Sequence, residues 1–313
     1  MLNNKLDSKF LQLGLWLECN SHCAFCRNKE TIMDKNFTED KIDNIHRAIE
    51  IIKSLKKGEY DFLGIIGGEF FQGQITEDVA PHFIELAKLI KEKIDQGYLK
   101  QLFVATCLMG EHNYEEFQKY FGYYEKDHIL ICTSFNYFGQ FNLQFTKENW
   151  NRNFELFLQN GYNLHIEIIA TQANLEAIID EKFDLLYWVQ NNVRIDFLRP
   201  IDFCSQPKQN FPWFFPKRET FIKFMMFLEQ HYPNMLDDLM SLKQRASHLH
   251  NFTANEEISR SEEFNEGEGK ILDCGHSEIF KAYIDSDHCM ACDILAMYKR
   301  NKYRSPDRDM KDE

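Results

Sequence analysis

The sequence Cys19-Asn20-Ser21-His22-Cys23-Ala24-Phe25-Cys26 places three thiols within eight residues, directly after an apolar run that ends at Leu17. A buried strand that leads into a tight loop would bring these thiols close enough to bind one metal centre. Three thiolates can hold a 4Fe-4S cluster and leave its fourth iron without a protein ligand, which a reaction site requires. Zinc is the main alternative, although zinc sites usually draw on Cys-x-x-Cys pairs.

The composition is that of a globular protein, since 44% of the 313 residues are hydrophobic. A formal net charge of -13 predicts repulsion from nucleic acids and anionic membranes, so neither is expected as a partner. The chain has no apolar signal segment and no apolar run of about 18 residues, which predicts a cytoplasmic protein. Nine cysteines, an odd number with two tight groups, favour thiolate ligands over disulfides.

Short apolar runs alternate with segments of helical periodicity along the first 245 residues. This alternation predicts an α/β fold with a parallel sheet. Thr38 is expected to be the N-cap of the first long helix. The expected strands are residues 10–17, 60–66, 101–105, 128–132, 164–170 and 193–200, and the expected helices are 38–55, 83–94, 114–124, 150–158, 185–190 and 217–232.

The tripeptide Gly67-Gly68-Glu69 follows the second expected strand, about 40 residues after the cysteine loop, which is the distance that one crossover helix needs. By itself it is most simply a turn with a solvated acid. Together with Cys-x-x-x-Cys-x-Phe-Cys, in which Phe25 is the aromatic residue before the last cysteine, it resembles the signature of the radical S-adenosylmethionine (radical SAM) superfamily.

This resemblance implies a partial (β/α)6 barrel with its ligands at the carboxyl ends of the strands. It implies that Cys19, Cys23 and Cys26 bind a 4Fe-4S cluster whose open iron chelates S-adenosylmethionine (SAM). Reductive cleavage of SAM would give a 5′-deoxyadenosyl radical that abstracts hydrogen from a substrate. Residues Gly67, Gly68 and Glu69 would run past the methionine end of SAM, and a flavodoxin or ferredoxin would supply the electron.

Further SAM contacts are carried over from the resemblance to the ends of later strands. Ser134 and Asn136 would reach the ribose, although polar capping of the strand end explains them equally well. Thr171 would line the adenine side, and Arg199 would reach SAM or a substrate, with a surface ion pair as the commoner alternative. Cys107 and Cys132 are expected to be ordinary buried residues. His165 and Glu167 share a strand face, and packing is the simpler explanation for both.

A second group of cysteines follows a polar, acidic stretch, residues 243–270, that predicts a linker. Cys274 precedes an alternating run and the turn Asp285-Ser286-Asp287, after which come Cys289 and Cys292; a hairpin would bring these cysteines together. This small cysteine-rich module resembles the twitch or SPASM extension of radical SAM enzymes, which implies a second iron-sulfur cluster. A zinc knuckle and unligated thiols are the alternatives.

Cys204 is the expected fourth ligand of this second centre, and His276, His288 or a substrate would replace it if it does not reach. The expected domains are therefore the barrel over residues 1–245, the auxiliary module over 246–298 and a charged tail over 299–313.

The expected function is radical SAM chemistry on a peptide or protein, because twitch and SPASM extensions are common among such maturation enzymes. Only 18 residues precede Cys19, which leaves no room for a leader-peptide recognition domain. One alternative is oxidation or rearrangement of a small molecule such as a sugar or nucleotide. Another is a metal-binding protein without catalytic activity. The sequence does not specify the substrate.

Overall fold

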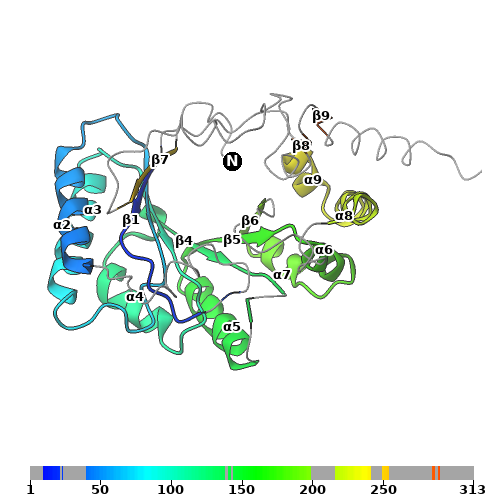
Figure 1. Cartoon of the computed structure of the whole chain (residues 1–313), viewed down its shortest axis with the longest axis horizontal. Coiled ribbons are helices and arrows are strands. Elements are labelled where there is room, and N and C mark those ends of the chain that lie inside the picture. Colours follow the sequence, from blue (N-terminus) through cyan, green and yellow to red (C-terminus); the bar gives the residue numbers. More distant parts are fainter. Residues whose placement is uncertain are drawn as a thin grey trace, which may run out of the picture. The chain divides into compact units, whose positions relative to one another are not determined.

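The computed structural model describes residues 10–21, 23, 40–137, 140–141, 144–198, 216–240, 249–253, 284–285 and 288–289. Parallel strands alternate with helices through most of this range (Figure 1). The strands are β1 (Phe10–Gly14), β2 (Phe62–Ile66), β3 (Gln101–Ala105), β4 (Ile129–Ser134), β5 (Asn163–Ile169), β6 (Arg194–Leu198), β7 (Leu249–Thr253), β8 (Ile284–Asp285) and β9 (His288–Cys289). The helices are α2 (Lys41–Ser54), α3 (Ala80–Asp95), α4 (Asn113–Phe121), η1 (Lys126–His128), α5 (Gln144–Gln159), α6 (Gln172–Ile179), α7 (Leu185–Gln190), α8 (Arg218–His231) and α9 (Pro233–Met240).

The main sheet has the order β6-β5-β4-β3-β2-β1-β7, so the six predicted strands lie side by side in sequence order. Each pair of neighbouring strands from β1 to β5 is parallel. Each connection between them carries a helix, and α2 to α5 lie on the outer side of the curved sheet (Figure 1). The predicted α/β partial barrel is therefore confirmed.

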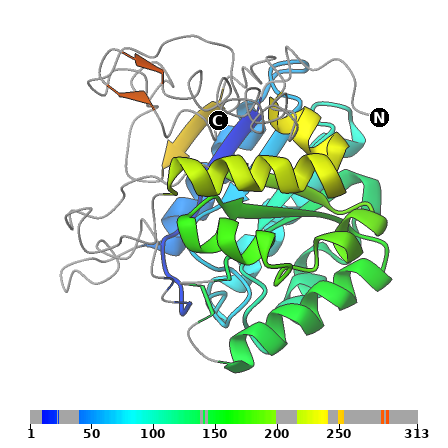
Figure 2. The ribbon, with the colours of Figure 1, turned by 90° about the vertical axis from the view of Figure 1, so that its right-hand side faces the viewer.

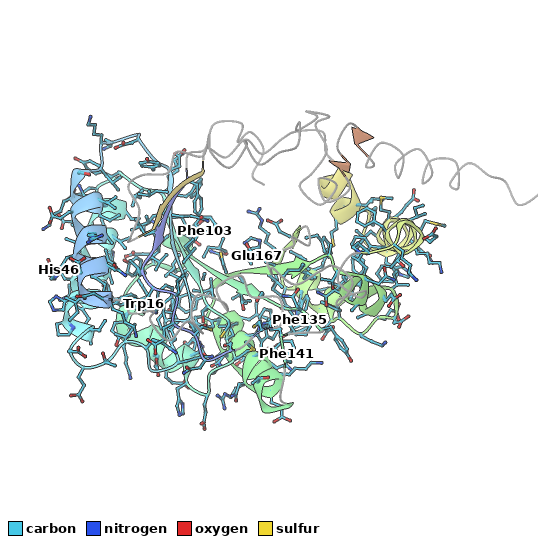
Figure 3. All side chains as sticks on the ribbon, in the orientation of Figure 1. Trp16, His46, Phe103, Phe135, Phe141 and Glu167 are labelled. Atoms are coloured by element: carbon cyan, nitrogen blue, oxygen red, sulfur yellow. The ribbon has the colours of Figure 1, made fainter. Side chains whose placement is uncertain are left out.

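Alternate residues of each strand face opposite sides of the sheet. On β1 and β3 the residues that face the helices, such as Leu13 and Val104, are buried, whereas Gln12 and Phe103 between them are partly exposed. We call the side that carries Gln12 and Phe103 the inner face. The strand registers place Cys132, Ser134, His165 and Glu167 on the same side, and Phe103 and Glu167 both project from it (Figure 3).

The helix α2 begins two residues later than the sequence predicted. Its N-cap is Asp40, whose carboxylate accepts a hydrogen bond from the N–H of Asp43 at 2.9 Å. The assignment of Thr38 as the N-cap was wrong, because a second capping residue closer to the periodic apolar positions satisfies the first turn. The buried face of α2, which includes Ile45 and Ile52, packs on α3.

Aromatic side chains fill the space behind the segment that follows β2. Phe70 and Phe71 are both fully buried, and Phe71 meets Phe117 and Phe121 edge to face at centroid distances of 5.6 and 6.3 Å. Trp16 packs against Phe70 with their ring centroids 4.7 Å apart. Each such pair stabilises by about 0.5–1.5 kcal/mol beyond its buried area, so this cluster fixes the backbone on both sides of Glu69.

The strand β7 was not predicted. It pairs in parallel with β1 over its whole length, and Figure 2 shows the two strands side by side. Its residues lie inside the stretch 243–270, which the sequence indicated to be a linker. The polar residues of this segment do not form a pattern that predicts a strand. The segment pairs with β1 because the edge of that strand is otherwise unpaired.

The short strands β8 and β9 form an antiparallel pair with Ile284 opposite Cys289 and Asp285 opposite His288. This pair corresponds to the tip of the predicted C-terminal hairpin. Cys204, Cys274 and Cys292 lie outside the described residues, and so do His276 and Arg199.

The chain divides into two compact units. One holds β1 to β4, α2 to α5, most of β5, α7, most of β6 and β7. The other holds α6, α8 and α9, which pack on one another in that order. In the part of the chain that the structure describes, no helix combines the length and the apolar character that a membrane crossing needs.

Candidate active site at the carboxyl ends of the strands

The cysteine loop leaves the carboxyl end of β1, as the sequence predicted. Cys19 and Cys23 are both partly exposed, and the backbone N–H of Ser21 donates to the sulfur of Cys19 at 3.4 Å. Two accessible thiols four residues apart, one of which already accepts a hydrogen bond, fit the demands of an iron-sulfur cluster. Cys26 and Phe25 lie outside the described residues.

The two glycines of Gly67-Gly68-Glu69 are needed because another backbone approaches them closely. A Cβ on Gly67 would lie 2.1 Å from the carbonyl oxygen of Trp16, and one on Gly68 would lie 1.9 Å from that of Glu18. The N–H groups of Gly68 and Glu69 donate to these two carbonyls at 2.7 and 2.9 Å. The glycines therefore let the segment that precedes Cys19 continue its pairing beyond the end of the sheet.

The carboxylate of Glu69 is fully buried. One oxygen accepts hydrogen bonds from the N–H groups of Phe70 and Phe71, both at 2.9 Å. The side chains of Thr106 and Asn113 also donate to it, at 2.9 and 3.2 Å, and the N–H of Cys107 donates to the other oxygen at 2.5 Å. Glu69 thus joins the loop after β2 to the loop after β3, a role that needs no ligand.

Cys107 takes part in the same network, which its sequence context did not predict. Its sulfur lies 3.1 Å from the hydroxyl of Ser21 and 3.2 Å from the amide nitrogen of Gln72. Burial and, second, the charge of Glu69 raise the pKa of Cys107 well above its ordinary value, so the thiol is neutral at physiological pH.

A cavity of about 530 Å³ opens beside this loop. Asn20 and Ser21 of the cysteine loop line it together with Gln72, and Glu111 and Glu116 give it a negative charge. Solvent and small solutes can therefore reach the cysteine loop through this cavity.

The predicted SAM contacts at later strand ends differ in what they already bind. Asn136 is fully buried, and both its backbone N–H and its side-chain amide donate to Gln140. Thr171 is 1% exposed and caps α6 by accepting from the N–H of Asn174. Capping thus accounts for these two residues, whereas Ser134 is partly exposed on the inner face, opposite Glu167.

A group of ionisable side chains occupies the inner face of β5 and β6. The Nε2 atom of His165 lies 3.1 Å from a carboxylate oxygen of Asp196, and Arg194 donates to the same oxygen at 2.7 Å. Cys132, opposite His165 on β4, lies 3.7 Å from the Nδ1 atom of that imidazole. Because its two nitrogens face different partners, His165 cannot bring both partners to one metal ion.

The two carboxylates of this group have opposite pKa shifts. Burial would raise the pKa of Asp196, but the contacts with His165 and Arg194 outweigh it and hold the pKa well below its ordinary value. Burial raises the pKa of Glu167, and His165 opposes this only in part. One carboxylate is therefore fixed in its charged form while its neighbour is biased towards the protonated acid.

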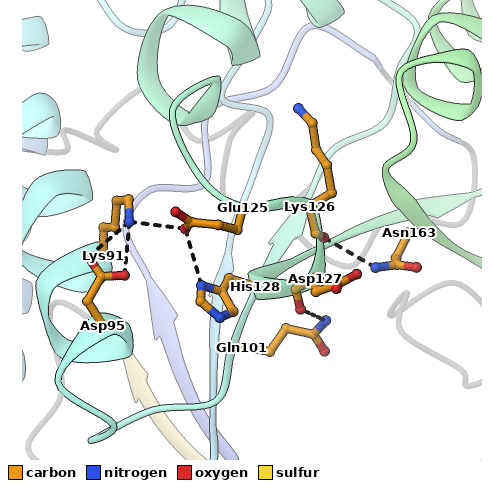
Figure 4. A network of polar contacts seen from close by, with 8 residues as sticks. All are labelled: Lys91, Asp95, Gln101, Glu125, Lys126, Asp127, His128 and Asn163. Atoms are coloured by element: carbon orange, nitrogen blue, oxygen red, sulfur yellow. Dashed lines mark hydrogen bonds and ion pairs between the residues drawn. The ribbon is translucent and has the colours of Figure 1, made fainter.

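A separate polar network lies at the amino ends of β3 to β5 (Figure 4). Asp95, Glu125 and His128 are close enough to be considered as metal ligands. The ammonium of Lys91, however, contacts Asp95 at 2.9 Å and Glu125 at 3.1 Å, so a cation of the protein already neutralises the two carboxylates. In a parallel barrel this end contributes to stability, and active sites lie at the other end.

No protein-family model matches the chain, and no curated protein matches it. Several solved structures do. One is anSMEcpe, an anaerobic sulfatase-maturating radical SAM enzyme, with AdoMet bound; the TM-score is 0.51 and the identity 14%, over 74% of this chain and 62% of the other. The fold is that of the radical SAM partial barrel. Another match is the same protein with AdoMet and a Cp18Cys peptide, with a TM-score of 0.50 and 14% identity over 74% and 61% of the two chains.

The radical SAM partial barrel accounts for the described residues of β1 to β6 and their helices. This chain spans less than two thirds of the length of the solved proteins that it matches. At 14% identity the likeness concerns the fold, and the chemistry has to be argued from the residues of this chain.

Proposed function

We propose that this chain is a radical SAM enzyme, with Cys19, Cys23 and Cys26 as the ligands of a 4Fe-4S cluster. The observation that supports this most is the place of the two partly exposed thiols of Cys19 and Cys23, in the loop after the carboxyl end of β1 in a radical SAM barrel, where Cys19 accepts a hydrogen bond from Ser21. When bound, the cluster and SAM together supply a 5′-deoxyadenosyl radical, which abstracts hydrogen from the substrate.

The chain itself positions the reactants and moves protons. Gly67, Gly68 and Glu69 hold the loops after β1, β2 and β3 together, and Ser134, which is partly exposed on the inner face, would contact SAM. We assign the inner face to the substrate. The pair of carboxylates there, one charged and one biased towards the protonated acid, would take up or release a proton as the substrate reacts.

The proposed substrate is a peptide or protein. Two of the matching structures contain a peptide, named Cp18Cys in one and Kp18Cys in the other, and their barrel is similar to that of this chain. A small molecule such as a sugar or nucleotide is the alternative outcome. A flavodoxin or ferredoxin is the proposed electron donor, and the cytoplasm is the proposed location.

We propose further that Cys274, Cys289 and Cys292 hold a second iron-sulfur cluster, with Cys204 as its fourth ligand. The antiparallel pair β8–β9, which carries Cys289 at its edge, supports the hairpin on which this assignment depends. Counting iron in the wild type and in Cys289→Ala tests it, because two 4Fe-4S clusters predict a fall from about eight irons to about four. No change in iron would reject the second cluster.

Anaerobic reconstitution with iron, sulfide and SAM, followed by reduction, tests the main proposal. The wild type is expected to form 5′-deoxyadenosine, and Cys19→Ala and Cys23→Ala are expected to form none. Ser54→Ala serves as the control, since its exposed hydroxyl at the end of α2 donates to the carbonyl oxygen of Ile51. Zinc in place of iron, together with no 5′-deoxyadenosine, would reject radical chemistry in favour of a metal-binding protein.

A further inference from the structure

Cys107 joins three loops at the carboxyl ends of neighbouring strands. Its sulfur contacts Ser21, which lies between two of the proposed cluster ligands, and Gln72, which follows β2. Its own backbone N–H donates to Glu69. The amide of Gln72 also donates to the hydroxyl of Ser21 at 3.1 Å, so the three side chains close a ring of contacts.

The backbone beside Cys107 is held in an unfavourable conformation. Leu108 has a φ of 58° and is fully buried, and for a residue other than glycine the left-handed region costs about 1–2 kcal/mol. Asn153, on α5, donates to the carbonyl oxygens of Leu108 and Gly110 at 2.9 and 2.8 Å and so retains this turn. The position of Cys107 is therefore set by the barrel and not by the cysteine loop.

Ser21 connects Cys107 with the proposed cluster site. Its N–H donates to the sulfur of Cys19, and hydrogen bonds to cysteine sulfurs are among the factors that set the potential of an iron-sulfur cluster. Such a bond stabilises the more negative, reduced state of the centre, so its loss makes the cluster harder to reduce.

We propose that Cys107 is a positioning residue, which holds Ser21 so that the Ser21 N–H stays on the sulfur of Cys19 and raises the reduction potential of the cluster. The inference rests on the proposed function, because it requires a cluster at Cys19, Cys23 and Cys26. Neither the sequence motif nor the SAM-binding residues carried over from the resemblance include Cys107.

The test compares reconstituted full-length Cys107→Ala with Ser54→Ala, which removes an exposed hydroxyl at the end of α2 that donates to the carbonyl oxygen of Ile51. The reduction potential is measured by redox titration with electron paramagnetic resonance, and iron is counted in each sample. Cys107→Ala is expected to keep its iron but to show a reduced-to-oxidised ratio about tenfold lower at a fixed potential, or about 59 mV for a one-electron couple. Ser54→Ala is expected to match the wild type.

Two further variants keep the test decisive if Cys107→Ala folds poorly. Ser21→Ala removes the hydroxyl at a partly exposed position and is expected to lower the potential in the same direction. Cys107→Ser supplies a hydroxyl that Ser21 and Gln72 can still contact, and it is expected to restore most of the wild-type potential.

Equal potentials for the wild type, Cys107→Ala and Ser21→Ala would overturn the inference and leave the proposed function intact. Loss of iron from Cys107→Ala and Cys107→Ser alike would also overturn it, because Cys107 would then be a ligand. Absence of any cluster from the wild type would overturn both the inference and the proposed function.

Discussion

Two carboxylates of the barrel, the fully buried Glu69 and the partly buried Asp196, are satisfied in contrasting ways. Glu69 accepts hydrogen bonds from backbone N–H groups, a hydroxyl and an amide, all of them uncharged. Asp196 contacts an arginine and a histidine. The first arrangement fixes the shape of the loops that surround the proposed cluster. The second holds charged side chains on the inner face, so the residues that shape the loops and the residues that carry charge are separate in this barrel.

The largest effect is expected from Glu69→Gln. The backbone N–H groups of Phe70 and Phe71 donate to one carboxylate oxygen and that of Cys107 to the other, so the NH₂ group of a glutamine would face at least one N–H group in either orientation. A buried donor without a partner costs about 1–3 kcal/mol, and lost hydrogen bonds to a charged group add a similar amount, so the free energy of unfolding should fall by about 3–4 kcal/mol. Urea denaturation measures it.

The matched control is Glu50→Gln on the exposed face of α2, where the carboxylate is 72% exposed and forms an ion pair with Lys53. This variant should unfold at the same urea concentration as the wild type. If Glu69→Gln were equally harmless, the hydrogen bonds to Glu69 would not organise the loops.

A smaller, pH-dependent effect is expected from Asp196→Asn. Folding lowers the pKa of Asp196, so the unfolded chain takes up this proton first as the pH falls. The stabilisation is present above the ordinary carboxyl pKa of about 3.9 and is lost as the pH falls through the lower folded value. At pH 7 the variant should be less stable by about 2 kcal/mol.

The check is the difference in unfolding free energy between wild type and Asp196→Asn, measured from pH 7 down to pH 3. The difference should shrink as the pH falls, because the wild type progressively loses the contribution that the variant lacks. A difference that stays constant over this range would mean that the contacts of Asp196 with His165 and Arg194 do not depend on its charge.

Glu167→Gln should have the opposite sign. Folding raises the pKa of Glu167, so its contribution is fully present below the ordinary value of about 4.3 and is lost as the pH rises through the folded value. At pH 8 the variant, which buries no charge, should be about 1 kcal/mol more stable than the wild type. Near pH 4 the two should coincide in urea denaturation, and a gain that persists there would contradict the assignment.

The smallest effect is expected from Lys91→Met at the amino ends of the strands. Its partners Asp95 and Glu125 are half-exposed, and exposed ion pairs contribute little (Figure 4). The change in stability should be smaller than the changes expected for Glu69→Gln, Asp196→Asn and Glu167→Gln. Zinc is expected to leave the thermal midpoint of the wild type unchanged, since Lys91 occupies the position of a cation; a zinc-dependent rise would reveal a metal site.

The sequence predicted the strands and their order because each is a short apolar run between turns, a signal that depends only on neighbouring residues. It also placed Cys19 and the glycines correctly, since their spacing reports a single strand-helix-strand unit. The physical reason for Gly68 was not predictable, because the carbonyl oxygen that excludes a side chain there belongs to Glu18, fifty residues earlier.

The contacts of Cys107 could not be predicted for the same reason. Its partner Ser21 is separated from it by 86 positions, and a lone cysteine at a strand end has no local signature of a role. Arg194 and Asp196 lie two residues apart on one strand, so their ion pair could have been anticipated from the alternation of side chains. The approach of His165 to Asp196 depends on the register of two strands, which composition does not specify.

The strand β7 has a consequence for how this chain can be shortened. It covers the edge of β1, whose N–H and C=O groups would otherwise be available to a strand of another molecule. A protein cut at residue 245, the boundary that the sequence indicated, would retain every element from β1 to α9 and lose this cover. Such a fragment would expose the edge that leads directly into Cys19, and aggregation, not unfolding, would be its first failure.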